Sequence, residues 1–192
     1  MARKILIVTG DAGESYETLY AYHRFLEAEW EPLIAAPSKR RLNLVIHDFA
    51  PGWDTYVERT GYLVASHITF AEVDVDDYEA VLVLGGRAPE YLRNDQQLLS
   101  IIKRFRDQDK WIFAICHGIQ VLISAGLARG AVMTAYEHIR YEIEAGGGTY
   151  STEQAVRDGR VVTAQTWQSH PEFYREVFAC LGVGRGELVG DR

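Results

Sequence analysis

Short apolar runs alternate with longer amphipathic segments along most of this chain. The run Val81-Leu82-Val83-Leu84 has no polar alternation, which is typical of a strand buried on both faces. The pattern predicts strands over Lys4–Val8, Pro32–Ala36, Ala80–Leu84 and Trp111–Ile115, and helices over Glu17–Trp30, Gln96–Gln108 and His117–Ala125. Such alternation indicates β-α-β units, and therefore a doubly wound α/β fold with helices on both faces of a mostly parallel sheet.

The last part of the chain is expected to form a hairpin and a helix. Residues Ala155–Val162 suit the hairpin, with Asp158-Gly159 supplying the positive φ angles of a two-residue turn. The helix is expected from about Glu172 to Leu181. Residues 183–192, rich in glycine and charge, look like a loose tail, so we expect a single domain over residues 1–182.

One connection is long for this architecture. Residues 38–61 separate two predicted elements and contain His47, Trp53 and Tyr56. Connections of this length usually carry structure of their own or serve a function. We expect this segment to form a small hairpin or a lid over the functional site.

Composition narrows the class of protein. With 192 residues, 47% of them hydrophobic and 24% charged, the chain has the make-up of a globular domain. The formal net charge of −7 argues against a nucleic-acid partner. The apolar stretch Ile5–Val8 is far too short for a signal peptide or a membrane span, so we expect a cytoplasmic protein without a membrane partner.

Cys116 is the candidate for covalent chemistry. It follows the strand Trp111–Ile115 directly and precedes His117 and Gly118 at the start of a predicted helix. The N-terminal end of a helix presents unpaired N–H groups, which lower the pKa of a thiol and favour the thiolate. A cysteine at a strand end is also often a small buried apolar residue, and that interpretation suits Cys180. Without metal-type spacing, both cysteines are expected to be free thiols.

Three loops at the predicted carboxyl edge of the sheet carry polar or reactive groups. They are residues 9–14, residues 85–90 and the bend at Cys116. Ligands of open parallel sheets bind at this edge. An acid beside a thiol supplies a proton donor and acceptor, and glycines let backbone N–H groups approach a developing oxyanion. The three loops together predict a covalent catalytic site.

Three motifs stand in order along the chain: GDAGESYE (residues 10–17), GGRAPEYL (residues 85–92) and AICHGIQ (residues 114–120). They resemble the PfpI/ThiJ superfamily of class-I-glutamine-amidotransferase-like proteins, over residues 4–182. The resemblance implies a flavodoxin-like fold with the nucleophile on a sharp elbow. Residues 46–49 and 170–173 look most like the branch that contains the double-domain plant glyoxalases of glyoxalase III type.

The resemblance also implies roles for individual residues. Cys116 would be the nucleophile in a strained backbone conformation, and Glu14 would hydrogen-bond its sulfur. The two groups would share one proton, because two anions are not accommodated in one small desolvated site. Backbone N–H groups of Gly86 and His117 would form the oxyanion hole. Further candidates for substrate binding are Gly85, Gly118 and His170.

His117 and Glu90 imply an oligomer. In PfpI-type proteins the histidine after the cysteine is oriented by a glutamate of the neighbouring subunit, and Glu90 occupies that position here. We therefore expect a homo-oligomer, either a dimer or a trimer of dimers, with the site near an interface.

Each candidate also has a plain structural interpretation. Glu14 suits a helix cap or a first helical turn, where acidic residues are favoured. The pair Gly85-Gly86 suits a tight turn, and His170 suits a loop before the last helix. The six histidines show no i,i+4 pairing, so we expect no metal site.

These residues leave three functional hypotheses. The first is a glyoxalase, independent of glutathione and of any cofactor, that converts 2-oxoaldehydes such as methylglyoxal to 2-hydroxy acids through a hemithioacetal on Cys116. The second is a PfpI-type cysteine hydrolase, namely an amidase, a peptidase or a deglycase. The third is a non-catalytic redox sensor or chaperone-like stress protein, with Cys116 oxidised to a sulfinic acid that Glu14 stabilises.

Overall fold

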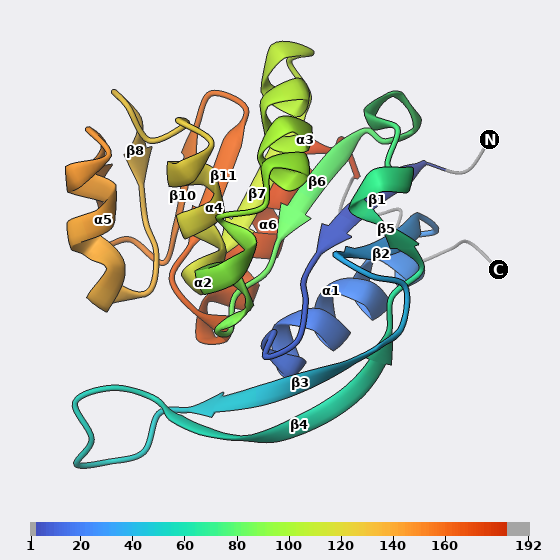
Figure 1. Cartoon of the computed structure of the whole chain (residues 1–192). Helices are drawn as coiled ribbons and strands as arrows, with labels where there is room; N and C mark the ends of the chain where they lie inside the picture. The colour runs from blue at the N-terminus through green and yellow to red at the C-terminus, as the bar shows by residue number, and fades with distance from the viewer. Residues whose placement is uncertain (1–2, 184–192) are drawn as a thin grey trace, which may run out of the picture.

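The computed structural model describes residues 3–183 and is built around a seven-stranded sheet (Figure 1). The strand order is β10-β11-β7-β6-β1-β2-β5, and all neighbours are parallel except β10 and β11. These strands are β1 (Lys4–Val8), β2 (Glu31–Ala36), β5 (Ile68–Thr69), β6 (Ala80–Val83), β7 (Trp111–Ile115), β10 (Ala155–Asp158) and β11 (Val161–Ala164). Two separate pairs are β3 (Arg41–Asp48) with β4 (Val57–Ala65), and β8 (Val132–Met133) with β9 (Thr149–Tyr150).

Helices cover both faces of the sheet. They are α1 (Ser15–Glu27), α2 (Ala88–Leu92), α3 (Gln96–Asp107), α4 (Ile119–Ser124), α5 (Arg140–Ala145) and α6 (His170–Cys180). Helices α1 and α6 pack on one face, against β1, β2, β10 and β11, and α3 and α4 pack on the other, against β6 and β7 (Figure 1). Short 3₁₀ turns are η1 (Phe70–Glu72), η2 (Val75–Asp77), η3 (Cys116–Gly118), η4 (Glu137–Ile139) and η5 (Trp167–Ser169). The predicted doubly wound, mostly parallel α/β fold is confirmed.

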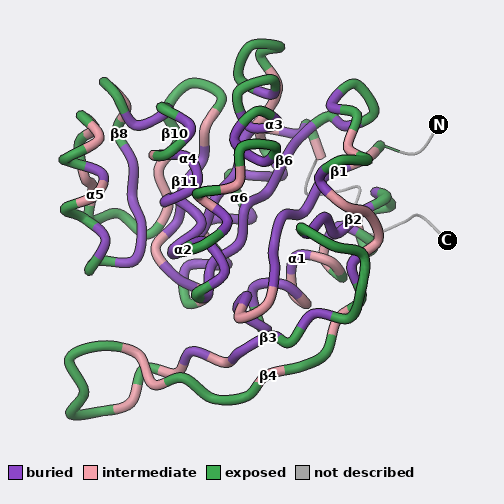
Figure 2. Tube along the Cα trace, in the orientation of Figure 1, coloured by how far each residue is buried: buried purple, intermediate pink, exposed green. Residues whose placement is uncertain are grey.

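The central strands explain the unbroken apolar runs of the sequence. Side chains of β1 beyond Lys4 and of all of β6 are inaccessible to solvent (Figure 2). A strand between two layers of helices has no solvent-facing side, so a polar alternation would bury unpaired polar groups. The sheet therefore forms the middle of one continuous hydrophobic core.

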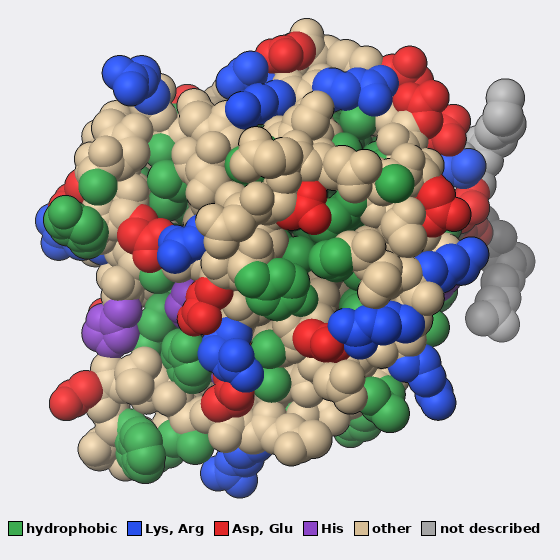
Figure 3. Space-filling model, viewed as in Figure 1, with side chains coloured by type: hydrophobic (Ala, Val, Ile, Leu, Met, Phe, Trp, Pro, Cys, Tyr) green, Lys and Arg blue, Asp and Glu red, His purple; other side chains and the backbone are tan. Residues whose placement is uncertain are grey.

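The surface carries charges of both signs. Acidic and basic side chains are interspersed on the face shown in Figure 3. Many form exposed pairs, such as Arg3 with Glu79 and Arg40 with Asp11, which add little to stability because water screens them. Between residues 3 and 183, no helix has the length and apolar character needed to cross a bilayer.

Two predicted elements differ in detail from the structure. The helix expected over His117–Ala125 begins with the 3₁₀ turn η3, and α4 covers only its middle, because the chain leaves β7 through a left-handed residue. In the β10–β11 hairpin, Asp158 pairs with Val161, so the turn residues are Gly159 and Arg160. Gly159 has φ of +56°, which suits the first position of a type II′ turn, whereas the prediction placed the turn one residue earlier.

Residues 38–61 contain most of the antiparallel β3–β4 hairpin, as one of the two sequence alternatives anticipated. The hairpin lies apart from the main sheet and runs below it to a tip at residues 49–56 (Figure 1). Its strand β3 packs on α1 and its tip reaches toward the end of the sheet that carries α5. The predicted tail, residues 183–192, lies outside the described residues except for Val183.

Candidate active site

Cys116 lies at the point where β7 ends. Its backbone φ is +58°, a left-handed conformation that costs an L-residue roughly 1–2 kcal/mol. The residue before it is extended and the three residues from Cys116 form the turn η3, so the chain makes the predicted sharp elbow. The residue is buried, with 5% of its surface exposed. Strain at a buried cysteine indicates a functional requirement rather than simple packing.

The carboxyl group against the sulfur belongs to Glu17 rather than to Glu14. The Glu17 side chain is completely buried, and its Oε2 accepts a hydrogen bond of 2.6 Å from the N–H of Gly85. Burial and the nearby Glu14 raise the pKa of Glu17 well above its usual value, and the hydrogen bonds with the Gly85 N–H and with the Cys116 thiol lower it by less. The sequence-based assignment of Glu14 as the partner of the sulfur is therefore wrong.

Glu14 has the role of a helix cap. Its Oε2 accepts a hydrogen bond of 2.6 Å from the N–H of Glu17, and its Oε1 accepts one of 3.4 Å from the N–H of His47. These contacts satisfy one of the free donors at the start of α1 and fix the loop onto β3. The plain structural interpretation of Glu14 was the correct one.

A sequence signal for Glu17 was available. Glu17, Ala21 and Phe25 follow one another at four-residue spacing on α1, and all three are buried. A carboxylate within an apolar helical stripe is unusual, because burying its charge without a partner is costly. Such a residue is a candidate for a shifted pKa and for chemistry.

Burial sets the pKa of the Cys116 thiol. Desolvation raises this pKa well above its usual value and a negative charge on Glu17 raises it further, whereas the N–H groups of His117 and Gly86 lower it. The lowering expected from the helix start is thus present but smaller than the effect of burial. The same two N–H groups face the sulfur and so stand where an oxyanion on an attacked carbon would form.

Position 86 requires glycine because of its backbone conformation and because of the atoms that surround it. It has φ of +78° and forms an isolated bridge with Gly13, and a Cβ would collide with Ala12 O and Glu14 N. Gly85 lies close to Cys116, since a Cβ there would be 2.6 Å from Cys116 Cβ. The two glycines therefore let the loop approach both Cys116 and the Glu14 backbone.

Gly86→Ala is expected to destabilise the protein by about 2–5 kcal/mol, the sum of left-handed strain and overpacking. Gly126→Ala is a matched control, because Gly126 has φ of +81° with open space around its Cα. This control should lose only about 1–2 kcal/mol. Urea unfolding of both variants measures the difference, and equal losses would show that the contacts of Gly86 with the Ala12–Glu14 backbone are unimportant.

His117 packs beside the thiol. Its Nδ1 lies 3.3 Å from Cys116 Sγ, and its ring packs against Tyr136 with a centroid separation of 5.1 Å. Burial lowers the pKa of His117 to about 4, with the charges of His47 and Arg93 as smaller causes. The imidazole is therefore neutral near pH 7.

Glu90 lies exposed on the first turn of α2. Within residues 3–183 its carboxylate makes no hydrogen bond, and only its backbone oxygen accepts one, from Asn94 Nδ2 at 3.2 Å. The structure contains one subunit, so the pairing of Glu90 with His117 of a neighbouring subunit stays a prediction.

Two predicted substrate-binding residues lie elsewhere. A Cβ on Gly118 would collide with Val83 O, so this glycine allows η3 to pack on β6. His170 stacks on Tyr20 with centroids 4.5 Å apart and lines a separate cavity of about 980 Å³ along α1 and α6, which Cys116 does not line. Spacing along the chain gave no information on which face of the sheet His170 occupies.

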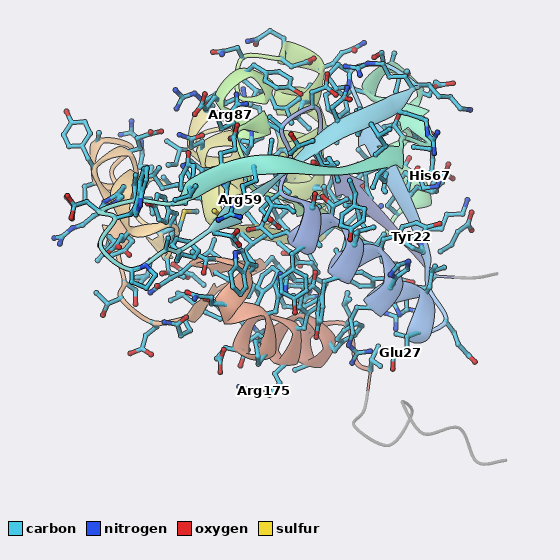
Figure 4. The ribbon with its side chains drawn as sticks, turned by 90° about the horizontal axis from the view of Figure 1, so that it is seen from below. Tyr22, Glu27, Arg59, His67, Arg87 and Arg175 are labelled. Carbon is cyan, nitrogen blue, oxygen red and sulfur yellow. The ribbon has the colours of Figure 1, made fainter. Side chains whose placement is uncertain are left out.

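The β3–β4 hairpin brings residues to the site that sequence reasoning did not select. His47 Nε2 is 2.9 Å from Glu58 Oε2, and Arg87 donates to both oxygens of Glu58 at 2.6 and 2.9 Å. Figure 4 shows Arg87 beside the hairpin. Burial lowers the pKa of His47, and the Arg87 guanidinium lowers the pKa of Glu58. The array is therefore a neutral imidazole held by an arginine–carboxylate pair, and it joins the hairpin to the loop that follows β6.

Among residues 3–183, no group of three or more His, Cys, Asp or Glu side chains is arranged to hold a metal ion. Both cysteines are free, Cys116 buried and Cys180 partly exposed. The groups available for chemistry at the elbow are thus a thiol, a buried carboxyl, a neutral imidazole and two backbone N–H donors.

Comparison with known proteins gives consistent results. The profile described as "DJ-1/PfpI family" matches residues 3–179. "Protein DJ-1 homolog D" of Arabidopsis thaliana is 34% identical over 94% of this chain, which spans about half (48%) of that relative. "Deglycase PfpI" of Pyrococcus furiosus is 32% identical, over 84% of this chain and 89% of its own length. The solved structure of Schizosaccharomyces pombe DJ-1 has the same fold, with a TM-score of 0.78 at 18% identity over 96% of this chain and 94% of that one.

Proposed function

The chain belongs to the DJ-1/PfpI family, and from this premise we propose that it is a glyoxalase-like enzyme that converts 2-oxoaldehydes to 2-hydroxy acids without glutathione. The observation that carries the proposal is the position of Cys116. Its sulfur lies between the Glu17 carboxyl and the N–H groups of His117 and Gly86, in a strained elbow. A nucleophile, a proton carrier and an oxyanion site thus surround one point.

The first step is attack on the aldehyde. Cys116 and Glu17 together hold one proton, which lies on Glu17 when the thiolate attacks, because two buried charges side by side are strongly disfavoured. A bond forms between sulfur and C1 of methylglyoxal, and the carbonyl electron pair moves onto oxygen. The N–H groups of Gly86 and His117 stabilise this oxyanion until it takes the proton of Glu17, which leaves a hemithioacetal.

The second step moves a proton between neighbouring carbons. The Glu17 carboxylate removes the proton from C1, the electron pair of the C–H bond forms a C1–C2 double bond, and the carbonyl oxygen of C2 becomes an enediolate oxygen. Glu17 then returns the proton to C2, and the hydroxyl proton on the C1 oxygen moves to the C2 oxygen. C1 is then a thioester and C2 an alcohol. Water attacks the thioester, the bond between carbon and sulfur breaks, and lactate leaves while Cys116 recovers its electron pair. C1 is oxidised as C2 is reduced, so the reaction needs no external oxidant or reductant.

A second candidate is a deglycase, which the name of the P. furiosus relative favours. In that case the thiol would attack the adduct formed between a 2-oxoaldehyde and an amino or thiol group, and the free group would leave before the hydroxy acid does. The same Cys116, Glu17 and N–H donors would serve, so the two candidates differ in the leaving group and in the size of the substrate.

The test uses the purified full chain without glutathione. Methylglyoxal loss and lactate formation are followed in one reaction, and recovery of the free amine from a methylglyoxal-treated peptide, purified from free aldehyde, in another. The proposal predicts lactate from free methylglyoxal faster than amine from the peptide. Faster amine recovery would favour the deglycase. No product in either reaction, together with conversion of Cys116 to the sulfinic acid by peroxide, would favour a redox sensor.

A further inference from the structure

The tip of the β3–β4 hairpin is hydrogen-bonded to the segment around η4, beside the nucleophile. Two hydrogen bonds hold it: Thr55 Oγ1 with Tyr136 OH at 2.8 Å, and His138 Nε2 with Asp54 O at 2.6 Å. A third bond, from Trp167 Nε1 to His47 O at 2.9 Å, holds the adjoining end of β3. Their partners come from η4, η5 and the residue before η4, at the end of the sheet away from β2 and β5. These bonds thus connect the hairpin to the segments that follow β8 and β11.

Aromatic rings fill the space between this tip and the thiol. Tyr56 packs edge-on to His117 with centroids 5.7 Å apart and contacts the Tyr136 ring at 5.6 Å. Burial raises the pKa of both tyrosines, and a negative charge on Cys116 is a smaller cause of the same rise, so both phenols lie near the sulfur. Cys116 is left 5% exposed. A route to the sulfur from the side of the tip therefore passes these rings.

The Tyr56 ring is supported by neighbouring side chains of the hairpin and of the loop after β6. Its ring stacks on the buried His47 ring with a centroid separation of 3.8 Å, and Glu58 and Arg87 anchor that imidazole. Elsewhere on the tip, Phe49 packs on Tyr136 and Trp167, whereas Trp53 is 63% exposed. The structure therefore stabilises one particular position of the Tyr56 ring, beside His117.

From this arrangement we infer that Tyr56, with Tyr136, determines specificity by admitting small free 2-oxoaldehydes and excluding aldehydes joined to an aromatic ring or a polypeptide. The inference rests on the proposed function for its substrate class. Rings whose centroids lie 5–6 Å apart are in direct contact, so a methyl group next to the carbonyl needs only a small displacement of the rings, whereas a phenyl group or a peptide would require the tip to move. Misfit of a bulky group against a packed wall typically costs 1–3 kcal/mol or more.

The first test compares methylglyoxal with phenylglyoxal. In Tyr56→Ala, the ratio of kcat/KM for phenylglyoxal to that for methylglyoxal is expected to rise about tenfold or more. Tyr62→Ala is the matched control, because Tyr62 lies on the same hairpin with its side chain 63% exposed and should leave the ratio unchanged. Tyr136→Phe, which removes only the hydroxyl that binds Thr55, should shift the ratio in the same direction by less.

The second test does not depend on turnover. In a Cys180→Ser background, alkylation of Cys116 by iodoacetamide is compared with alkylation by a bulky aryl maleimide. Tyr56→Ala should raise the rate with the maleimide about tenfold relative to iodoacetamide, while Tyr62→Ala should not. If the alkylation ratio rises but no variant makes a hydroxy acid, the wall exists and the proposed reaction is wrong. If Tyr56→Ala and Tyr136→Phe leave both ratios at the wild-type value, the inference is overturned whatever the reaction.

Discussion

Cys116→Ser is expected to lower lactate formation from methylglyoxal at least about a thousandfold, since loss of a covalent nucleophile has effects of this size or larger. A serine hydroxyl fits the same elbow but stays protonated near neutral pH, and the buried Glu17 is too weak a base to ionise it. Measuring lactate under saturating and limiting methylglyoxal separates a loss in kcat from a loss in binding.

Cys180→Ser is the control for this experiment. Cys180 lies at the C-terminal end of α6, away from the elbow, so its replacement should leave the rate within about twofold of the wild type. Circular dichroism and thermal melting check that both variants fold. Retention of substantial lactate formation by a folded Cys116→Ser protein would remove the covalent mechanism.

Glu17→Gln should lower the rate by about 10²–10⁴-fold, whereas Glu14→Gln should lower it less than about tenfold. Glutamine keeps an oxygen that can accept the N–H of Gly85, so the fold survives, but it cannot carry the proton between C1 and C2. At position 14 the amide oxygen can still cap α1, and the thiol loses no contact. Comparing the two variants therefore shows directly which carboxylate of the motif transfers the proton.

The pH dependence of thiol alkylation gives a second readout of this pair. A negative Glu17 raises the pKa of Cys116, so removing that charge should lower the thiol pKa and move the alkylation profile of Glu17→Gln to lower pH. Among the groups that shift the pKa of Cys116, Glu14 has the smallest effect, so Glu14→Gln should move the alkylation profile less. A larger shift in Glu14→Gln than in Glu17→Gln would restore the sequence-based assignment.

The fold was predictable because its signals are local. Strands such as β6 and β7 are continuous apolar runs, and in parallel sheets only a strand buried on both faces tolerates such a run. The elbow at Cys116 was predictable for the same reason, since an apolar strand meets a Cys-His-Gly sequence there. The exact turn at Gly159 was missed, because Asp-Gly and Gly-Arg both suit a two-residue hairpin and pairing decides between them.

The site was less predictable because its parts come together in three dimensions. Glu14 and Glu17 lie in one motif, and only the direction of each side chain on α1 tells which one meets the sulfur. Tyr56 and Tyr136 are 80 positions apart and meet above Cys116 through the course of the β3–β4 hairpin. No local sequence pattern specifies such a contact. In the same way, no pattern around His170 indicated that its imidazole would stack on Tyr20 of α1.

The most direct test of the account is to look for the covalent intermediate on Cys116. Wild-type protein is mixed with methylglyoxal, quenched with acid during turnover, digested and examined by mass spectrometry. The account predicts that the peptide carrying Cys116 gains the mass of one methylglyoxal, that hydroxylamine removes it as it does a thioester, and that the Cys180 peptide is unmodified. Lactate formation with an unmodified Cys116 peptide, or with the adduct on another residue, would contradict the account.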